Sequence, residues 1–213
     1  VVERGASLML HGAKIQITGG IYVKGGKLQI DHADILVEGC SGEYLMNLEN
    51  VAVVTITDSR IDCNRHCGLL KQNTGRLLIE DCELRHMAGV CGIFFSGRSV
   101  RIAKSRFYQG TCGMLSLSNA ADAKIYYCDF EGGEASYGGA IYSESMGDVV
   151  IWQCVFRKCR ARYLGSAVYF KYQKMGQSVW ECDCLQCEPS TEPFFNVVSK
   201  EIYQAEKMGG KLC

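Results

Sequence analysis

The sequence has little proline, no long apolar run and no net charge. Only two prolines stand against 24 glycines, so glycine, asparagine and aspartate are expected to make the turns. No stretch approaches the roughly 20 consecutive apolar residues that span a bilayer, and no apolar leader follows a charged start. A formal net charge of zero gives no global field that would attract nucleic acid. We therefore expect neither membrane insertion nor nucleic-acid binding.

The sequence shows a repeat of about 23 residues and no 3.6-residue periodicity of apolar residues, which would indicate helices. In each of its eight segments an aliphatic residue is followed three positions later by a small residue, and five positions later by another apolar residue. The aliphatic column is Leu10, Ile30, Ile56, Ile79, Ile102, Ile125, Ile151 and Val179. The small column is Ala13, Ala33, Ser59, Cys82, Ser105, Cys128, Cys154 and Cys182. The third column is Ile15, Ile35, Ile61, Leu84, Phe107, Phe130, Phe156 and Cys184.

A second block, short and led by glycine, follows most of these segments after a variable gap. Its members are "CGLL" from Cys67, "CGIFF" from Cys91, "CGML" from Cys112, "GGAIY" from Gly138 and "GSAVY" from Gly165. Repeats of this length with two or three short β-rich segments predict the coils of a parallel β-helix, in which identical columns stack along the axis. We expect an all-β solenoid of about eight coils.

The combined pattern, I-x-x-[small]-x-[I/F] followed by G-[I/A]-x-x, resembles the right-handed parallel β-helix repeats of the pectate-lyase-like superfamily. The segments "GGAIYS" (138–143) and "FRKC" (156–159) are similar to repeats of large bacterial surface β-helices. The resemblance implies one β-helix domain over residues 1–213, and the missing initiator Met suggests an excised piece of a longer protein. Residues 197–213 have the composition of a short helix that would cap the last coil. In such families the small column is often asparagine, whereas here it is Cys, Ser and Ala.

The 13 cysteines are an odd number in a chain long enough to build its own core. We expect free thiols in a reducing compartment, which favours the cytoplasm; nothing else in the sequence determines the location. Stacked, buried thiols are expected in two columns: Cys128, Cys154 and Cys182, and then Cys159 and Cys187. Disulfides stay open as an alternative.

A thiolate metal site is a further, less favoured alternative. It would use Cys182, Cys184 and Cys187 with Cys154 or Cys159. Zinc needs convergent ligands, whereas columns keep sulfur atoms in rows. The "CNRHC" segment (63–67) lacks a second ligand pair. We expect no metal and no cofactor.

The position after each aliphatic column residue should point outward. It is occupied in turn by His11, Asp31, Thr57, Glu80, Ala103, Tyr126, Trp152 and Trp180. The last three form an aromatic row that could hold sugar rings or a partner's apolar side chains. The alternative is aromatic packing between strands, or cover by the C-terminal segment.

A weaker candidate is a basic patch of Arg98, Arg101, Lys104 and Arg106, which suits an anionic ligand or an ordinary solvated strand face. The resemblance also raises the lyases and hydrolases of acidic polysaccharides, which need paired carboxylates or a carboxylate cluster with a basic residue. The nearest acidic strip is Asp31, Asp58, Glu80 and Asp81. The four histidines, His11, His32, His66 and His86, share no column.

These observations favour a noncatalytic recognition or scaffold module that binds a glycan or a protein partner through an outer face. One alternative is a polysaccharide lyase or glycoside hydrolase. The other is an architectural spacer rod with no ligand.

Overall fold

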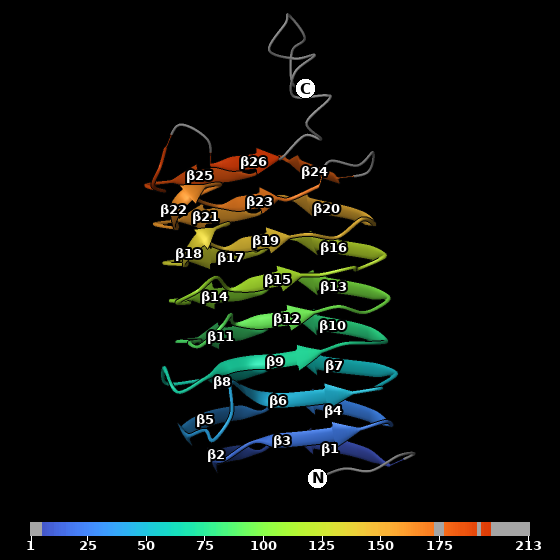
Figure 1. Ribbon diagram of the computed structural model, residues 1–213. Helices are drawn as coiled ribbons and strands as arrows, with labels where there is room; N and C mark the ends of the chain where they lie inside the picture. Colours follow the sequence, from blue (N-terminus) through green and yellow to red (C-terminus); the bar gives the residue numbers. More distant parts are fainter. Residues whose placement is uncertain (1–5, 173–176, 191–192, 197–213) are drawn as a thin grey trace, which may run out of the picture.

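The computed structural model describes residues 6–172, 177–190 and 193–196. Within them the chain is a parallel β-solenoid, whose strands stack coil upon coil into three long sheets (Figure 1). The described part contains no helix, and hence no helical segment suited to crossing a membrane. The predicted capping helix over residues 197–213 lies outside the described residues.

Each long sheet has eight strands. The first sheet comprises β1 (Ser7–His11), β4 (Lys27–Asp31), β7 (Val53–Thr57), β10 (Arg76–Glu80), β13 (Ser99–Ala103), β16 (Asp122–Tyr126), β20 (Asp148–Trp152) and β24 (Gln177–Trp180). The second comprises β2 (Lys14–Thr18), β5 (Asp34–Gly39), β8 (Arg60–Asp62), β11 (Glu83–Arg85), β14 (Arg106–Tyr108), β17 (Asp129–Glu131), β21 (Val155–Arg157) and β25 (Asp183–Leu185).

The third sheet comprises β3 (Ile21–Lys24), β6 (Tyr44–Glu49), β9 (Gly68–Gln72), β12 (Ile93–Phe95), β15 (Leu115–Leu117), β19 (Ile141–Ser143), β23 (Val168–Phe170) and β26 (Phe194–Asn196). Two further strands, β18 (Glu134–Tyr137) and β22 (Arg160–Leu164), pair with each other in the loops between the second and third sheets. We call this pair the ledge.

The strand register confirms the predicted columns. Ile79 pairs with Ile56 on one side and with Ile102 on the other, and Ile102 pairs in turn with Ile125. All four side chains are fully buried. Because burial of an isoleucine side chain contributes about 1.5–3 kcal/mol, a column of this kind supplies much of the core. The Gly-led blocks likewise form or precede the strands of the third sheet.

The turn from the first sheet to the second uses a left-handed residue in every coil. These residues have φ between 46° and 59° and are Gly12, His32, Asp58, Asp81, Lys104, Tyr127, Gln153 and Glu181. The expectation that Gly, Asn and Asp make the turns is therefore wrong for most of this column. The amide of each of the first seven donates to the carbonyl of the next coil, as Asp81 N does to Ala103 O at 3.2 Å. These bonds between coils help offset the roughly 1–2 kcal/mol that a left-handed side-chain-bearing residue costs.

The small column forms a hydrogen-bonded ladder of hydroxyls and thiols in place of asparagine amides. Ser105 Oγ donates to Ala103 O at 2.7 Å and accepts from the Cys82 amide at 3.1 Å. Ser59 makes the same pair of bonds, and in the last coils the Cys154 amide donates to Cys182 Sγ at 3.4 Å. Small polar side chains therefore satisfy backbone groups that the sharp turn leaves inside the solenoid.

Gly92 in the second block allows close approach between coils. A Cβ atom there would lie 2.6 Å from the carbonyl oxygen of Met114, which belongs to the next coil. No side chain fits without moving that backbone, which explains the glycine at this position.

The cysteines of the described residues are all free, as predicted. In the first predicted column Cys128 and Cys154 are buried, but Cys182, in the last described coil, is only half-buried. In the second, Cys159 and Cys187 are buried. Burial is the main cause that raises the pKa of the Cys82 thiol to about 11. These thiols behave as small core residues that also donate to backbone carbonyls.

Candidate functional site

The predicted aromatic row lies on the outer face of the first sheet. Tyr126 pairs with Trp152, and Trp152 pairs with Trp180 in the next coil. Tyr126 is half-buried, whereas Trp152 is 38% exposed and Trp180 is 61% exposed. Ala103, predicted to point outward in the same row, is fully buried.

Neighbouring side chains extend this row in ways that the columns did not indicate. Tyr127, in the left-handed turn position, is 48% exposed and places its ring centroid 5.2 Å from that of Trp152. The indole nitrogen of Trp152 donates to Glu181 at 3.1 Å. The Arg101 guanidinium lies 5.1 Å from the Tyr126 ring centroid. The aromatic side chains of this row therefore pack partly against one another. Tyr126, Trp152 and Trp180 line none of the four grooves identified in the described part of the chain.

The four predicted basic residues are all exposed but do not share one surface. Arg101 lies on β13 and Arg106 on β14, which belong to different sheets. Lys104, in the turn between them, contacts Glu80 at 3.2 Å and Asp81 at 3.7 Å. The hydrogen bond to Glu80 raises the pKa of Lys104. Arg98 lies in the turn before β13.

A groove of about 760 Å³ lies on the third sheet, beneath the ledge. The outer side chains of β12, β15 and β19, which are Phe94, Ser116 and Tyr142, line its floor. Tyr137 of β18 and Arg162 of β22 line its wall. We call this the ledge groove. The sequence did not reveal it, because its wall comes from the loops of variable length.

Several tyrosines surround one end of the ledge groove. The Tyr137 centroid lies 4.8 Å from that of Tyr169 and 5.1 Å from that of Tyr163. Tyr142 stacks on Tyr169 with planes inclined by 5°. These ring contacts fix the orientations of the four tyrosines, which together form an aromatic surface.

Few ionisable groups line the ledge groove. Among the described residues its carboxylate is Glu134, its cation is Arg162, and its exposed thiol is Cys112. Beyond the floor, Glu144 accepts from Lys171 and from Ser118, both at 3.0 Å. The hydrogen bond from Lys171 lowers the pKa of the Glu144 carboxyl.

A comparison with models of protein families matches residues 44–181 to the right handed beta helix region. The chain belongs to this right-handed β-helix family. The match spans more than half of the chain and includes the aromatic row, the ledge and the ledge groove. No curated protein and no solved structure matches the chain significantly. Family membership establishes the coil architecture of this β-helix and leaves its ligand to be argued from its surfaces.

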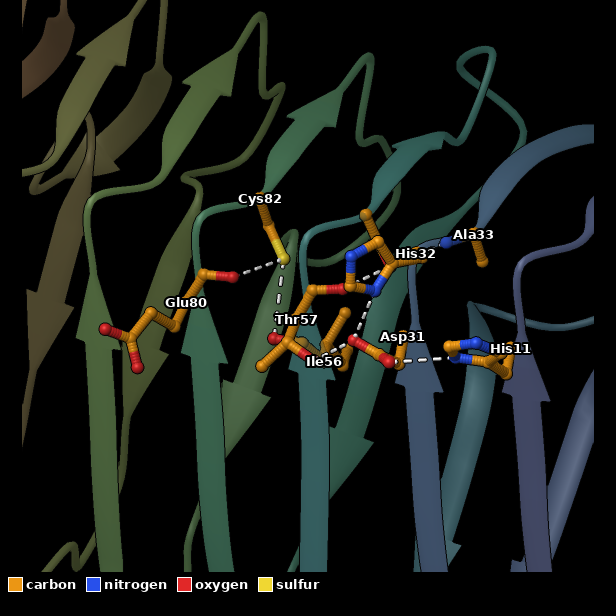
Figure 2. A network of polar contacts seen from close by, with 9 residues as sticks. His11, Asp31, His32, Ala33, Ile56, Thr57, Glu80 and Cys82 are labelled. Atoms are coloured by element: carbon orange, nitrogen blue, oxygen red, sulfur yellow. Dashed lines mark hydrogen bonds and ion pairs between the residues drawn. The ribbon is translucent and has the colours of Figure 1, made fainter.

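The acidic strip of this β-helix is largely engaged in ion pairs. Glu80 and Asp81 contact Lys104, and Asp31 lies between two histidine rings. Figure 2 shows His11, Asp31 and Glu80 at the ends of strands β1, β4 and β10 of the first sheet. The four histidines share no column in the sequence, but the fold brings two of them together. His11 and His32 both contact the carboxylate of Asp31.

In the "CNRHC" segment the two thiols contact each other inside the solenoid, and the histidine lies on the surface. Cys63 and Cys67 are buried, whereas His66 is exposed. In the described ranges, the group of histidine, cysteine and carboxylate side chains close enough to share an ion is His11, Asp31 and His32.

Proposed function

We propose that the domain is a noncatalytic recognition module that binds a glycan in the ledge groove. The observation that carries the proposal is the groove itself, which has a volume of about 760 Å³ and a floor with two aromatic rings. Among its described residues it has a single carboxylate. Ligand sites in proteins usually measure roughly 300–1,000 Å³ and combine aromatic surface with a few polar groups. Phe94 and Tyr142 supply faces on which sugar rings stack, and Glu134 and Arg162 supply hydrogen-bonding groups.

The carboxylate content of the groove favours binding over hydrolysis. Hydrolysis of a glycosidic bond uses two carboxylates, about 5–9.5 Å apart, on either side of the scissile bond. Glu134 lines the groove, whereas Glu144 is held by Lys171 and Ser118. A calcium-dependent lyase would need a cluster of carboxylate oxygens, which the described lining does not provide.

The aromatic row supports a second candidate, contact with a protein partner. Trp180, at the end of β24, is 61% exposed, and Tyr127, in the turn after β16, is 48% exposed. Large exposed aromatic residues are typical anchors of protein interfaces. An architectural rod without a ligand accounts for neither the ledge groove nor this row.

A glycan array read with three proteins separates these candidates. Wild type should bind a family of related glycans, Tyr142→Ala should lose that binding, and Trp152→Ala should retain it. Each variant serves as the control for the other, because both remove one ring from an outer face. Loss in Trp152→Ala alone would place the glycan on the aromatic row. A wild-type protein that binds nothing on the array would contradict glycan recognition.

A further inference from the structure

The first two coils bring two imidazoles to one carboxylate. His11 ends β1, and Asp31 ends β4 directly beside it in the parallel register. His32 follows in the left-handed turn, with φ of 49°. Figure 2 shows the Asp31 carboxylate between the two rings. His11 Nδ1 lies 2.9 Å from Asp31 Oδ2, and His32 Nδ1 lies 3.0 Å from Asp31 Oδ1.

Backbone and side-chain bonds fix the carboxylate and the turn. Thr57 donates from Oγ1 to Asp31 Oδ1 at 2.7 Å. This bond is the main cause that lowers the pKa of Asp31. The His32 amide donates to Thr57 O at 3.2 Å, and the Gly12 amide donates to Asp31 O at 3.0 Å. The Asp31 side chain is only 20% exposed, whereas the two imidazoles are more than 60% exposed.

The spacing and chemistry of these groups suit a divalent transition metal. One ligand atom from each of the three residues lies within 4.8 Å of the other two. Ligands on a tetrahedral zinc ion, with bonds of about 2.1 Å, lie about 3.4 Å apart. Side-chain rotations that move the ring nitrogens by up to about 1.4 Å close that difference. Two imidazoles with one carboxylate favour Zn²⁺ over Ca²⁺ or Mg²⁺, which prefer oxygen ligands.

We propose that His11, Asp31 and His32 form a zinc site on the first sheet. The three side chains supply three ligands, and the fourth position faces solvent, where water or a group from a partner can occupy it. Thr57 acts as a positioning residue, because its hydroxyl orients the Asp31 carboxylate. The site lies in the first two coils, apart from the ledge groove, and does not depend on glycan binding.

The test is a Zn²⁺ titration of the whole domain, made without a polyhistidine tag and followed by ¹⁵N NMR of the imidazoles. A histidine-specific signal is needed because free thiols also bind zinc. We expect the His11 and His32 resonances to shift together at one equivalent, with those of His66 and His86 unchanged. His11→Ala and Asp31→Asn should each weaken the binding seen at His32 by at least about tenfold.

The matched control is His86→Ala. His86 Nδ1 lies 2.9 Å from Asp62 Oδ1, so it repeats one half of the proposed site without a second imidazole. This variant should bind zinc at His11 and His32 as wild type does. The proposal is overturned if the His11 and His32 resonances do not move at one equivalent, or if they move equally in Asp31→Asn.

Discussion

The rings of Phe107 and Phe130 lie one above the other in successive coils, with centroids 4.6 Å apart and planes inclined by 17°. Phe156 continues the stack at 5.2 Å from Phe130. All three side chains are fully buried. The parallel register imposes this arrangement, because residues of one column are direct strand neighbours. Stability in this domain therefore depends on contacts between coils rather than on contacts within a coil.

Shortening one residue of the aliphatic column should destabilise the whole domain. Ile102 is fully buried between Ile79 and Ile125. We expect Ile102→Ala to lower the free energy of unfolding by about 2–5 kcal/mol, measured by urea denaturation. Lys124→Ala, on the outer face of the next strand, should change it by less than about 0.5 kcal/mol. Equal effects would contradict an interior column at Ile102.

Loss of a hydroxyl from the ladder should leave a backbone amide without a partner. Ser105 is fully buried and accepts from the Cys82 amide. Ser105→Ala should cost about 1–3 kcal/mol in unfolding free energy, because that amide loses its hydrogen bond. Ser105→Cys should cost less, since Cys182 makes the corresponding bond in its own coil. The half-buried Ser99 offers the control Ser99→Ala, expected to be nearly neutral. If Ser105→Ala is also neutral, the ladder has no role in stability.

Thiol reactivity should follow burial. Cys112 is exposed, whereas Cys128 and Cys154 are buried. We expect iodoacetamide to alkylate Cys112 first in the native domain, with the other two modified only on unfolding. Mass spectrometry of peptides from timed samples measures the order. Early modification of Cys154 would contradict the buried column of thiols.

Acid should weaken the domain partly through Glu144. The hydrogen bond from Lys171 lowers the pKa of Glu144 from its ordinary value of 4.5. The ionised group therefore stabilises the fold above pH 4.5, and this contribution disappears as the pH falls through the lower folded-state pKa. Glu144→Gln should lower the melting temperature at pH 7 and show a smaller further loss at acid pH than wild type. Parallel pH profiles for the two proteins would contradict this role.

The repeat was visible in the sequence because parallel stacking demands the same kind of residue at the same place in each coil. The columns headed by Leu10, Ala13 and Ile15 could therefore be aligned without a structure. The role of the small column was harder to predict. Serine and cysteine there accept hydrogen bonds from backbone amides, as asparagine does in related repeats, but only the geometry of the turn reveals these bonds.

The surfaces were less predictable, for two physical reasons. The wall of the ledge groove comes from β18 and β22, whose loops follow no fixed spacing. The histidine cluster combines residues from two different columns. His11 and Asp31 belong to the same column, whereas His32 belongs to the turn that follows, where its left-handed backbone conformation brings the ring to Asp31. The shared column of His11 and Asp31 was the signal available in the sequence.

Side-chain stacking from coil to coil is tested most directly by methyl NOE spectroscopy with isoleucine methyl labelling. Successive strands lie about 4.8 Å apart, so methyl groups of neighbouring coils lie within NOE range. We predict cross-peaks from Ile102 to both Ile79 and Ile125, and a continuous chain of them from Ile30 to Ile151. Absence of the cross-peaks from Ile102 to Ile79 and Ile125 in the folded domain would contradict the account.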